Sequence, residues 1–83
     1  MKLGIYVIRD DKTGYLSPTV DASDAAAVRN FQNAVTKTEG IINAFPQDFS
    51  LYRVGYYDTE TGLIEAHERE HLADGSSFKI AEV

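Results

Sequence analysis

The chain has 83 residues and carries a formal net charge of −5 at pH 7. Hydrophobic residues make up 43% of it and charged residues 25%, which is typical of a folded globular protein and excludes intrinsic disorder. Cysteine is absent, so disulfide bonds, thiolate nucleophiles and cysteine metal sites are excluded. We therefore expect a single domain over residues 1–83, with a thin core, because a chain this short buries only about 60–65% of its surface.

The acidic charge is concentrated towards the C-terminus. Residues 1–57 hold six acids and six bases, whereas residues 58–83 hold seven acids and two bases. A strongly basic nucleic-acid-binding domain is excluded, because each neutralised phosphate needs a Lys or Arg side chain, although a local basic patch is still compatible with residues 1–57. The longest apolar run, residues 3–8, is too short to span a membrane. We expect a soluble intracellular protein with no membrane partner.

The first predicted elements are two strands joined by a tight turn. Residues 3–9 are rich in β-branched and aromatic side chains, and residues 10–14 contain the Asp and Gly that favour a turn. Residues 15–20 form the returning strand. Because Pro18 has no amide hydrogen to donate, this strand is expected at an edge of the sheet.

A helix is predicted next, with Asp21 or Ser23 available to cap its first amides. Its apolar residues recur every three or four positions and form one stripe: Ala27, Val28, Phe31, Ala34 and Val35. Gly40 is expected to end the helix. A stripe this narrow and rich in alanine needs a sheet to pack on.

A loop at residues 41–50 leads into a second predicted hairpin, with strands at residues 51–57 and from residue 63 onwards. The resulting β-β-α-β-β order predicts an α+β fold, in which one helix packs on one face of a four-stranded antiparallel sheet. Residues 77–83 alternate in polarity and are a candidate for a short C-terminal strand.

The two predicted hairpin turns repeat one pattern, Asp-x-x-Thr-Gly, at residues 10–14 and 58–62. Their carboxylates suggest calcium, but neither turn has the oxygen spacing of a calcium-binding loop. Plain hairpin turns are therefore predicted.

Residues 67–71, His-Glu-Arg-Glu-His, match the H-E-x-x-H pattern that binds zinc in metallopeptidases. That chemistry needs a helix, which places the histidines one turn apart, and a third ligand that nothing in the sequence fixes. In a strand, His67 and His71 would lie about 13 Å apart, too far for one metal. Because residues 63–72 are compatible with strand or helix, a zinc peptidase stays as a remote alternative. Since no other catalytic pattern is present, we predict no enzyme activity, no metal and no cofactor.

The sheet face that the helix leaves uncovered is the candidate binding surface. Alternation along the strands assigns one set of apolar residues to the helix side: Leu3, Ile5, Val7, Tyr52, Val54 and Tyr56. The opposite face then carries Lys2, Tyr6, Arg53 and Tyr57, with Ile8, Tyr15, Leu63, Glu65 and His67 as neighbours.

Exposed tyrosines interleaved with basic residues can stack the bases of single-stranded nucleic acid, so Lys2, Tyr6, Arg53 and Tyr57 are predicted to bind it. Two glycines in these strands, at positions 4 and 55, would let a ligand approach the backbone closely. The same face would also serve as a homodimer interface, which is the commoner solution for a protein with so small a core, and we therefore expect a homodimer.

Two stretches of the sequence resemble a known phage family. Residues 45–58, FPQDFSLYRVGYYD, continue to Thr61 and Gly62, and residues 27–31 have the sequence AVRNF. In these features the chain resembles the small nonstructural protein of gokushovirus-type Microviridae, the small single-stranded DNA phages. The resemblance spans most of residues 2–64, and the H-E-x-x-H pattern lies beyond it.

This resemblance implies a non-virion protein in the cytoplasm of the infected bacterial host. It would act when genome synthesis switches towards single strands for packaging, and some family members are described as DNA-binding. The resemblance supplies no catalytic residues.

We therefore predict a non-enzymatic viral nonstructural protein that acts in phage single-stranded DNA synthesis or packaging. Its partners would be single-stranded DNA, a phage or host replication or packaging protein, or both. The alternative is a protein-interaction module that engages a viral or host protein without touching nucleic acid, through the same face or through the acidic residues 58–74.

Overall fold

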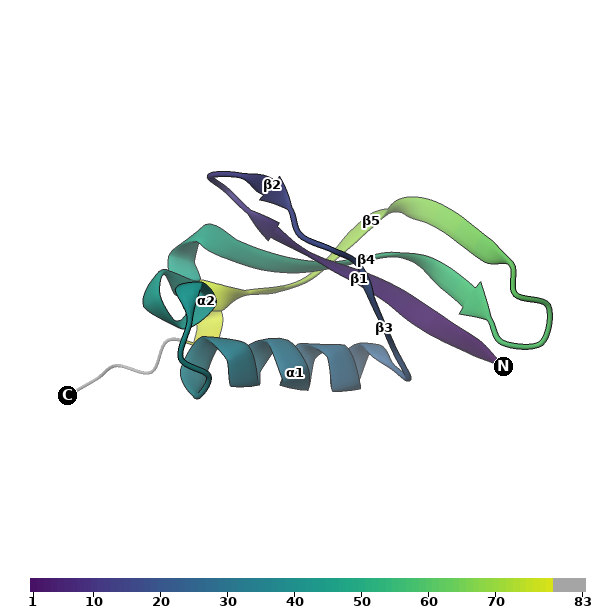
Figure 1. The fold of residues 1–83 in the computed structure, drawn as a ribbon, viewed down its shortest axis with the longest axis horizontal. Coiled ribbons are helices and arrows are strands. Elements are labelled where there is room, and N and C mark those ends of the chain that lie inside the picture. Colours follow the sequence, from purple (N-terminus) through teal and green to yellow (C-terminus); the bar gives the residue numbers. More distant parts are fainter. Residues whose placement is uncertain (79–83) are drawn as a thin grey trace.

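The computed structural model describes residues 1–78, which form five strands, one main helix and three short helical turns (Figure 1). The strands are β1 (Lys2–Asp10), β2 (Gly14–Tyr15), β3 (Thr19–Asp21), β4 (Phe49–Asp58) and β5 (Ile64–Asp74). The main helix, α1 (Asp24–Thr36), is followed by α2 (Ile41–Ala44), and the 3-10 helices are η1 (Pro46–Asp48) and η2 (Gly75–Phe78). The α+β fold predicted from the β-β-α-β-β order is confirmed.

Four predicted segments differ in detail from the structure. The loop expected at residues 41–50 contains α2, η1 and the first two residues of β4. The returning strand expected at residues 15–20 is divided into β2 and β3, because Pro18 lies between them and cannot donate to the ladder. Residues 63–72, whose sequence is compatible with either strand or helix, lie in strand β5 from Ile64 onwards. At the C-terminus, Ser77 and Phe78 belong to η2, and the rest of the candidate strand, residues 79–83, lies outside the described residues.

The five strands form one antiparallel sheet in the order β2-β1-β4-β5, with β3 also paired to β1. Helix α1 packs against one face of this sheet (Figure 1). The molecule is elongated, with principal extents of 48 × 23 × 19 Å. The start of β1 and the turn between β4 and β5 extend past the first residues of α1 (Figure 1), so the sheet is longer than the helix that covers it.

Helix α1 begins at its predicted cap. The Ser23 side chain accepts a 3.1 Å hydrogen bond from the amide of Ala26, as expected of an N-cap serine. The helix ends at Thr36, four residues before Gly40. Three members of the predicted stripe are buried against the sheet: Ala27, Phe31 and Val35.

The core lies between α1 and the sheet. Its strand residues are Tyr6, Phe49, Leu51 and Ala73, with Ile8 packed against them. Tyr6 is only 2% exposed, so the predicted assignment of Tyr6 and Ile8 to the uncovered face is wrong. By alternation, Leu3, Ile5 and Val7 lie on the face away from α1. Both faces of β1 carry apolar side chains, so strand polarity alone does not decide which face the helix covers.

A break in strand register changes the alternation on β4. The pairing of β4 with β1 shifts between Ile5 and Tyr6, and its pairing with β5 shifts between Arg53 and Gly55. Consequently Tyr56 lies on the same side as Arg53, whose guanidinium carbon is 5.0 Å from the Tyr56 ring centroid. A Cβ atom on Gly55 would lie 2.5 Å from the carbonyl oxygen of Glu65. Gly55 therefore allows β5 to approach, and is not an opening for a ligand.

Both Asp-x-x-Thr-Gly turns connect antiparallel strands, as predicted, but they close differently: Asp10 pairs with Gly14, whereas the amide of Asp58 donates to the carbonyl of Leu63. The carboxylates of Asp10 and Asp58 each accept a 2.9 Å hydrogen bond from the backbone amide two residues further along. Gly14 and Gly62 adopt φ angles of +101° and +77°, in the region that favours glycine.

Candidate nucleic-acid interface

The four residues predicted to form the binding platform do not lie together. Tyr6 is in the core beneath α1, and Arg53 is half-buried on the same side, next to the first turn of the helix. Lys2 is exposed near the far end of the sheet, where its ammonium group lies 3.5 Å from Glu65. Tyr57, half-buried, pairs with Leu3 on the face away from α1. The prediction that these four residues share one exposed face is therefore wrong.

Tyr6 and Arg53 instead belong to a polar network that joins α1 to the sheet. The Tyr6 hydroxyl donates a 2.7 Å hydrogen bond to Asp24, and the Arg53 guanidinium lies 2.5 Å from the other oxygen of that carboxylate. Arg53 also donates to Glu70 at 2.6 Å and to His67 at 3.3 Å. The Arg53 side chain is only 13% exposed, so its charge is already matched within the protein.

The network sets the ionisation of its members. Burial, followed by the hydrogen bond to Asp24, raises the pKa of Tyr6 and keeps the phenol protonated. Desolvation acts to raise the pKa of Asp24, but hydrogen bonds from Tyr6 and Arg53 outweigh it and hold that pKa below its usual value. The hydrogen bond to Asp24 raises the pKa of Arg53. The arrangement is that of a neutral phenol and a matched ion pair, which suits a structural role.

A second group of aromatic and basic side chains lies on the face away from α1. We name it the Tyr/Arg cluster, and it consists of Arg9 from β1, Tyr15 from β2, Tyr52 from β4, and Arg69 and His71 from β5. The Tyr15 and Tyr52 rings meet edge to face with centroids 6.3 Å apart, and the Tyr52 and His71 rings do so at 5.5 Å. Four strands thus contribute to one continuous aromatic surface.

Two guanidinium groups lie on these rings. The Arg69 guanidinium carbon is 4.6 Å from the centroid of Tyr52, and that of Arg9 is 5.9 Å from the centroid of Tyr15. Arg69 also donates a hydrogen bond to the Tyr15 hydroxyl. Both distances are within the range of cation–π attraction.

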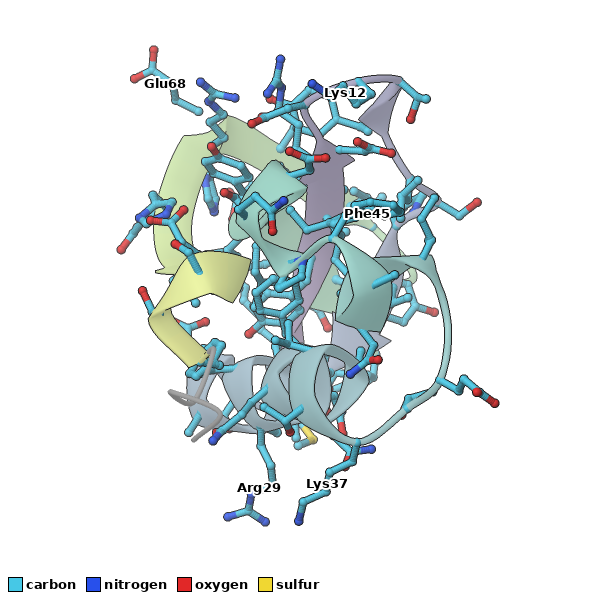
Figure 2. All side chains as sticks on the ribbon, turned by 90° about the vertical axis from the view of Figure 1, so that its left-hand side faces the viewer. Lys12, Arg29, Lys37, Phe45 and Glu68 are labelled. Carbon is cyan, nitrogen blue, oxygen red and sulfur yellow. The ribbon has the colours of Figure 1, made fainter. Side chains whose placement is uncertain are left out.

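The charge of the Tyr/Arg cluster is only partly matched. Arg9 forms a 2.7 Å ion pair with Asp11, and His71 contacts Asp74 at 2.8 Å. Within residues 1–78, by contrast, no carboxylate lies at ion-pair distance from Arg69. Figure 2 shows Lys12 and Glu68 on the side of the molecule opposite to Arg29 on α1 and to Lys37 at its end. The cluster can therefore offer aromatic rings and positive charge to a ligand.

Of this cluster, the sequence alone places only Tyr15 beside the predicted platform. It places Tyr52 on the helix side, because Tyr52 alternates with Val54 and Tyr56. The informative signal is the alternation of the apolar residues Phe49 and Leu51 just before Tyr52. Phe49 and Leu51 are both buried in the core, and a strand that turns these two inward must turn Tyr52 outward.

The H-E-x-x-H residues are part of strand β5, so the helix that the zinc peptidase alternative requires is not formed. The two histidines lie among different neighbours. His67 accepts from Arg53 on the helix side, whereas His71 packs against Tyr52 in the Tyr/Arg cluster. Within residues 1–78, no three His, Asp or Glu side chains are grouped so that they could hold a metal.

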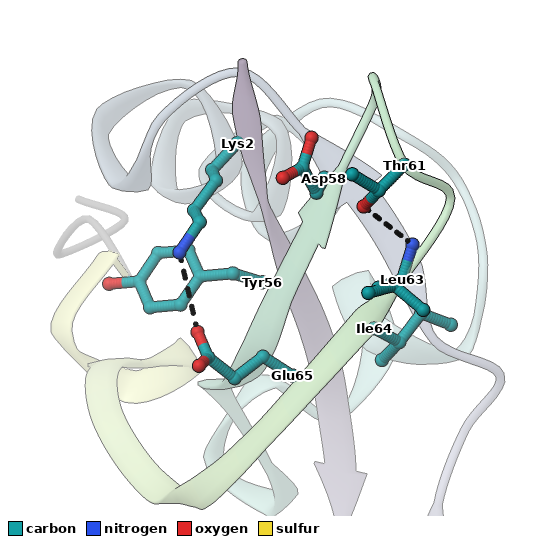
Figure 3. A pocket seen from close by; sticks show the side chains of 7 residues that line it. All are labelled: Lys2, Tyr56, Asp58, Thr61, Leu63, Ile64 and Glu65. Atoms are coloured by element: carbon teal, nitrogen blue, oxygen red, sulfur yellow. Dashed lines mark hydrogen bonds and ion pairs between the residues drawn. The ribbon is translucent and has the colours of Figure 1, made fainter.

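A separate hollow of about 360 Å³ lies at the end of the sheet beyond α1 (Figure 3). Its lining residues are Lys2, Tyr56, Asp58, Thr61, Leu63, Ile64 and Glu65. Figure 3 shows Lys2 and Glu65 joined by their ion pair at one side, with Leu63 and Ile64 at the other. Leu63 and Ile64 are 68% and 69% exposed, which makes this the most open apolar part of the hairpin.

Comparison with known proteins identifies a family. No curated protein and no solved structure matches the chain. None of the helices in residues 1–78 is long and apolar enough to cross a membrane. A family model described as "Phage ORF5 protein" matches residues 3–78, which extends past residue 64 and takes in all of β5. The chain therefore belongs to the Phage ORF5 protein family.

Proposed function

We propose that this phage protein is a non-enzymatic nonstructural protein of the gokushovirus-type Microviridae that binds single-stranded DNA. It acts in the cytoplasm of the infected bacterium, during synthesis or packaging of single-stranded phage DNA, alone or together with a phage or host replication protein. The observation that carries this proposal is the Tyr/Arg cluster, in which two tyrosine rings and the unmatched charge of Arg69 share the face away from α1.

The chemistry of the cluster favours single strands over duplexes. A base can stack on a tyrosine ring only when it is unpaired, and each such contact contributes about 1–3 kcal/mol with little dependence on sequence. Nearby guanidinium groups attract the phosphates, which adds affinity that falls with salt. The net charge of −5 opposes accumulation of phosphate on the protein, so the expected affinity is modest.

The four residues predicted from the sequence to bind nucleic acid have different roles in this proposal. Tyr57 remains a candidate for contact with a strand that continues along the sheet, since it shares the face of the cluster. Lys2 remains a candidate for a phosphate contact at the end of the sheet, where it is exposed beside Glu65. Tyr6 and Arg53 act within the polar network and hold the sheet beneath the helix.

The test is fluorescence anisotropy of a labelled single strand of about 20 nucleotides, with the matching duplex as a control. We expect salt-sensitive binding that prefers the single strand, and a loss of about tenfold in affinity for Tyr52→Leu. Tyr56→Leu, which removes a half-buried tyrosine from the helix side of the same strand, is the matched control and should bind normally. No binding by the wild-type protein at low salt would overturn the proposal.

A second candidate function is protein contact without nucleic acid, and the exposed Leu63 and Ile64 beside the hollow favour it. The partner that we would test first is a second copy of the chain, because a homodimer would cover this apolar end of the sheet. Sedimentation of the wild-type protein should then give twice the monomer mass, and Ile64→Lys should restore the monomer. A wild-type protein that stays monomeric over the whole accessible concentration range would exclude the homodimer, and a viral or host protein would then be the partner to test.

A further inference from the structure

Arg69 occupies the position on Tyr52 that a stacked base would need. Its guanidinium carbon is 4.6 Å from the ring centroid, and the other neighbours of this ring, Tyr15 and His71, meet it edge to face. A base and a guanidinium group are both planar and both stack on aromatic faces. The two groups cannot occupy the same place on the ring, so a ligand that stacks there must displace Arg69.

The attachments that keep Arg69 on the ring are few. Residues 67–69 have no register partner on β4, because the pairing shifts from Arg53 opposite Glu70 to Gly55 opposite Ala66. The side chain is held by its contact with Tyr52 and by the hydrogen bond to the Tyr15 hydroxyl, with no carboxylate at ion-pair distance within the described part of the chain. A long side chain on an irregular segment can change rotamer without disturbing the sheet.

We propose that Arg69 is a displaceable cover on Tyr52, which moves from the ring to a phosphate when single-stranded DNA binds. This inference rests on the proposed function and concerns the same site. A base then replaces the guanidinium group on Tyr52, and the displaced guanidinium group forms a charge-assisted contact with the backbone of the same strand. Arg69 thus opposes stacking and favours phosphate binding.

This exchange makes the site selective for ligands that bring a base and a phosphate together. A charged strand compensates for the displaced contact by offering Arg69 a stronger partner. An uncharged aromatic ligand offers no such partner and must stack against the competition of the guanidinium group. The presence of Arg69 therefore lowers affinity for uncharged bases while raising it for nucleic acid at low salt.

The test compares wild-type protein with Arg69→Ala over a range of salt concentrations, using the labelled single strand and a peptide nucleic acid of the same sequence. For the DNA strand, we expect Arg69→Ala to bind more weakly at low salt, with a salt slope smaller by about 0.7, the value for one lost phosphate contact. At higher salt the two affinities should become equal, and above that concentration Arg69→Ala should bind the DNA strand more tightly than the wild type. The uncharged oligomer should bind Arg69→Ala about two- to fivefold more tightly than wild type.

Two further variants keep the result interpretable. Arg9→Ala removes a guanidinium group that lies farther from its ring and is paired with Asp11. Its affinity for the DNA strand should stay below that of the wild type at all salt concentrations. Arg69→Lys keeps the charge without the planar group, so its salt slope should equal that of the wild type while the uncharged oligomer gains affinity. Circular dichroism checks that each variant is folded.

The outcomes separate this inference from the proposed function. Weaker DNA binding by Arg69→Ala at every salt concentration, with no gain for the uncharged oligomer in either Arg69 variant, would overturn the displaceable cover and leave DNA binding intact. Absence of wild-type binding to any single strand would overturn the proposed function itself, and the cover with it.

Discussion

The Tyr6 hydroxyl donates a 2.7 Å hydrogen bond to Asp24, the first residue of α1, and so connects the centre of the sheet to the start of the helix. Arg53 reaches the same carboxylate from the neighbouring strand β4. The tyrosine ring is nearly fully buried, whereas its hydroxyl meets a half-exposed carboxylate. One side chain therefore fills the core and fixes where the helix sits along the sheet.

Tyr6→Phe should lower the free energy of unfolding by about 1.5–3 kcal/mol, because it removes one hydrogen bond to a charged acceptor while the ring still fills the core. Urea denaturation measures this change. Tyr57→Phe is the control, since the Tyr57 hydroxyl makes no hydrogen bond to any residue in the range 1–78 and its removal should be nearly neutral. Equal effects of the two substitutions would contradict a stabilising role for the Tyr6–Asp24 bond.

Gly4→Ala should destabilise the protein by about 1–3 kcal/mol, because a Cβ atom at this position would overlap the hydroxyl and ring of Tyr6. Combining it with Tyr6→Phe removes the hydroxyl and part of the clash. The double variant should therefore be more stable than the sum of the two single effects implies, as measured by a double-mutant cycle in urea. Simple additivity would show that the glycine does not serve to accommodate Tyr6.

Acid should weaken the attachment of α1. The pKa of Asp24 is lower in the folded protein than in the unfolded chain, so the unfolded chain takes up the proton first as pH falls. The stability that Asp24 contributes is fully present above about pH 4, the usual pKa of an aspartate, and is lost as pH falls through the folded pKa. The difference in unfolding free energy between wild type and Asp24→Asn should accordingly shrink from pH 6 to about pH 3.

Glu39→Gln controls for the change in net charge in this experiment, since it removes an exposed carboxylate and leaves the network intact. Chemical denaturation at each pH gives the comparison. A difference between wild type and Asp24→Asn that stays constant across this range would contradict the pKa assigned to Asp24.

Gly62→Ala and Gly14→Ala should each cost about 1–2 kcal/mol of stability, because their φ angles of +77° and +101° are unfavourable for any residue with a Cβ atom. Neither position has a neighbour within 4 Å of an added Cβ, so conformation alone accounts for the effect. Gly40→Ala is a matched control, since Gly40 also has open space around it but an extended backbone with φ of 163°. Thermal unfolding should show a lower Tm for the first two variants and little change for the third.

The order of elements could be predicted because its signals are local. Ser23 caps the helix through the amide of a residue three positions away, and each Asp-x-x-Thr-Gly turn contains its own hydrogen bonds and glycine. The α+β layout depends on little else, and it is confirmed.

The choice of sheet face could not be predicted from strand polarity. On β1, Leu3, Ile5 and Val7 are as apolar as Tyr6 and Ile8, so alternation fits either orientation. The side covered by α1 depends on long-range contacts, namely the packing of the helix on Tyr6, Phe49 and Leu51 and the hydrogen bond between Tyr6 and Asp24. The Tyr/Arg cluster was missed for the same reason, since its members come from four strands and share a face only once the sheet is oriented.

The free edge of the sheet gives a different meaning to the His-Glu-Arg-Glu-His string of β5. The string at residues 67–71 is a palindrome, and β5 is the last strand of the sheet order. If two copies paired these edges about a two-fold axis through Glu68, Arg69 or Glu70, that residue would face its own twin. Like charges directly opposite one another are destabilising, and the broken register of residues 67–69 further disturbs any shared ladder. The charges of a pattern that resembles a metal motif thus disfavour the pairing of two copies edge to edge through β5.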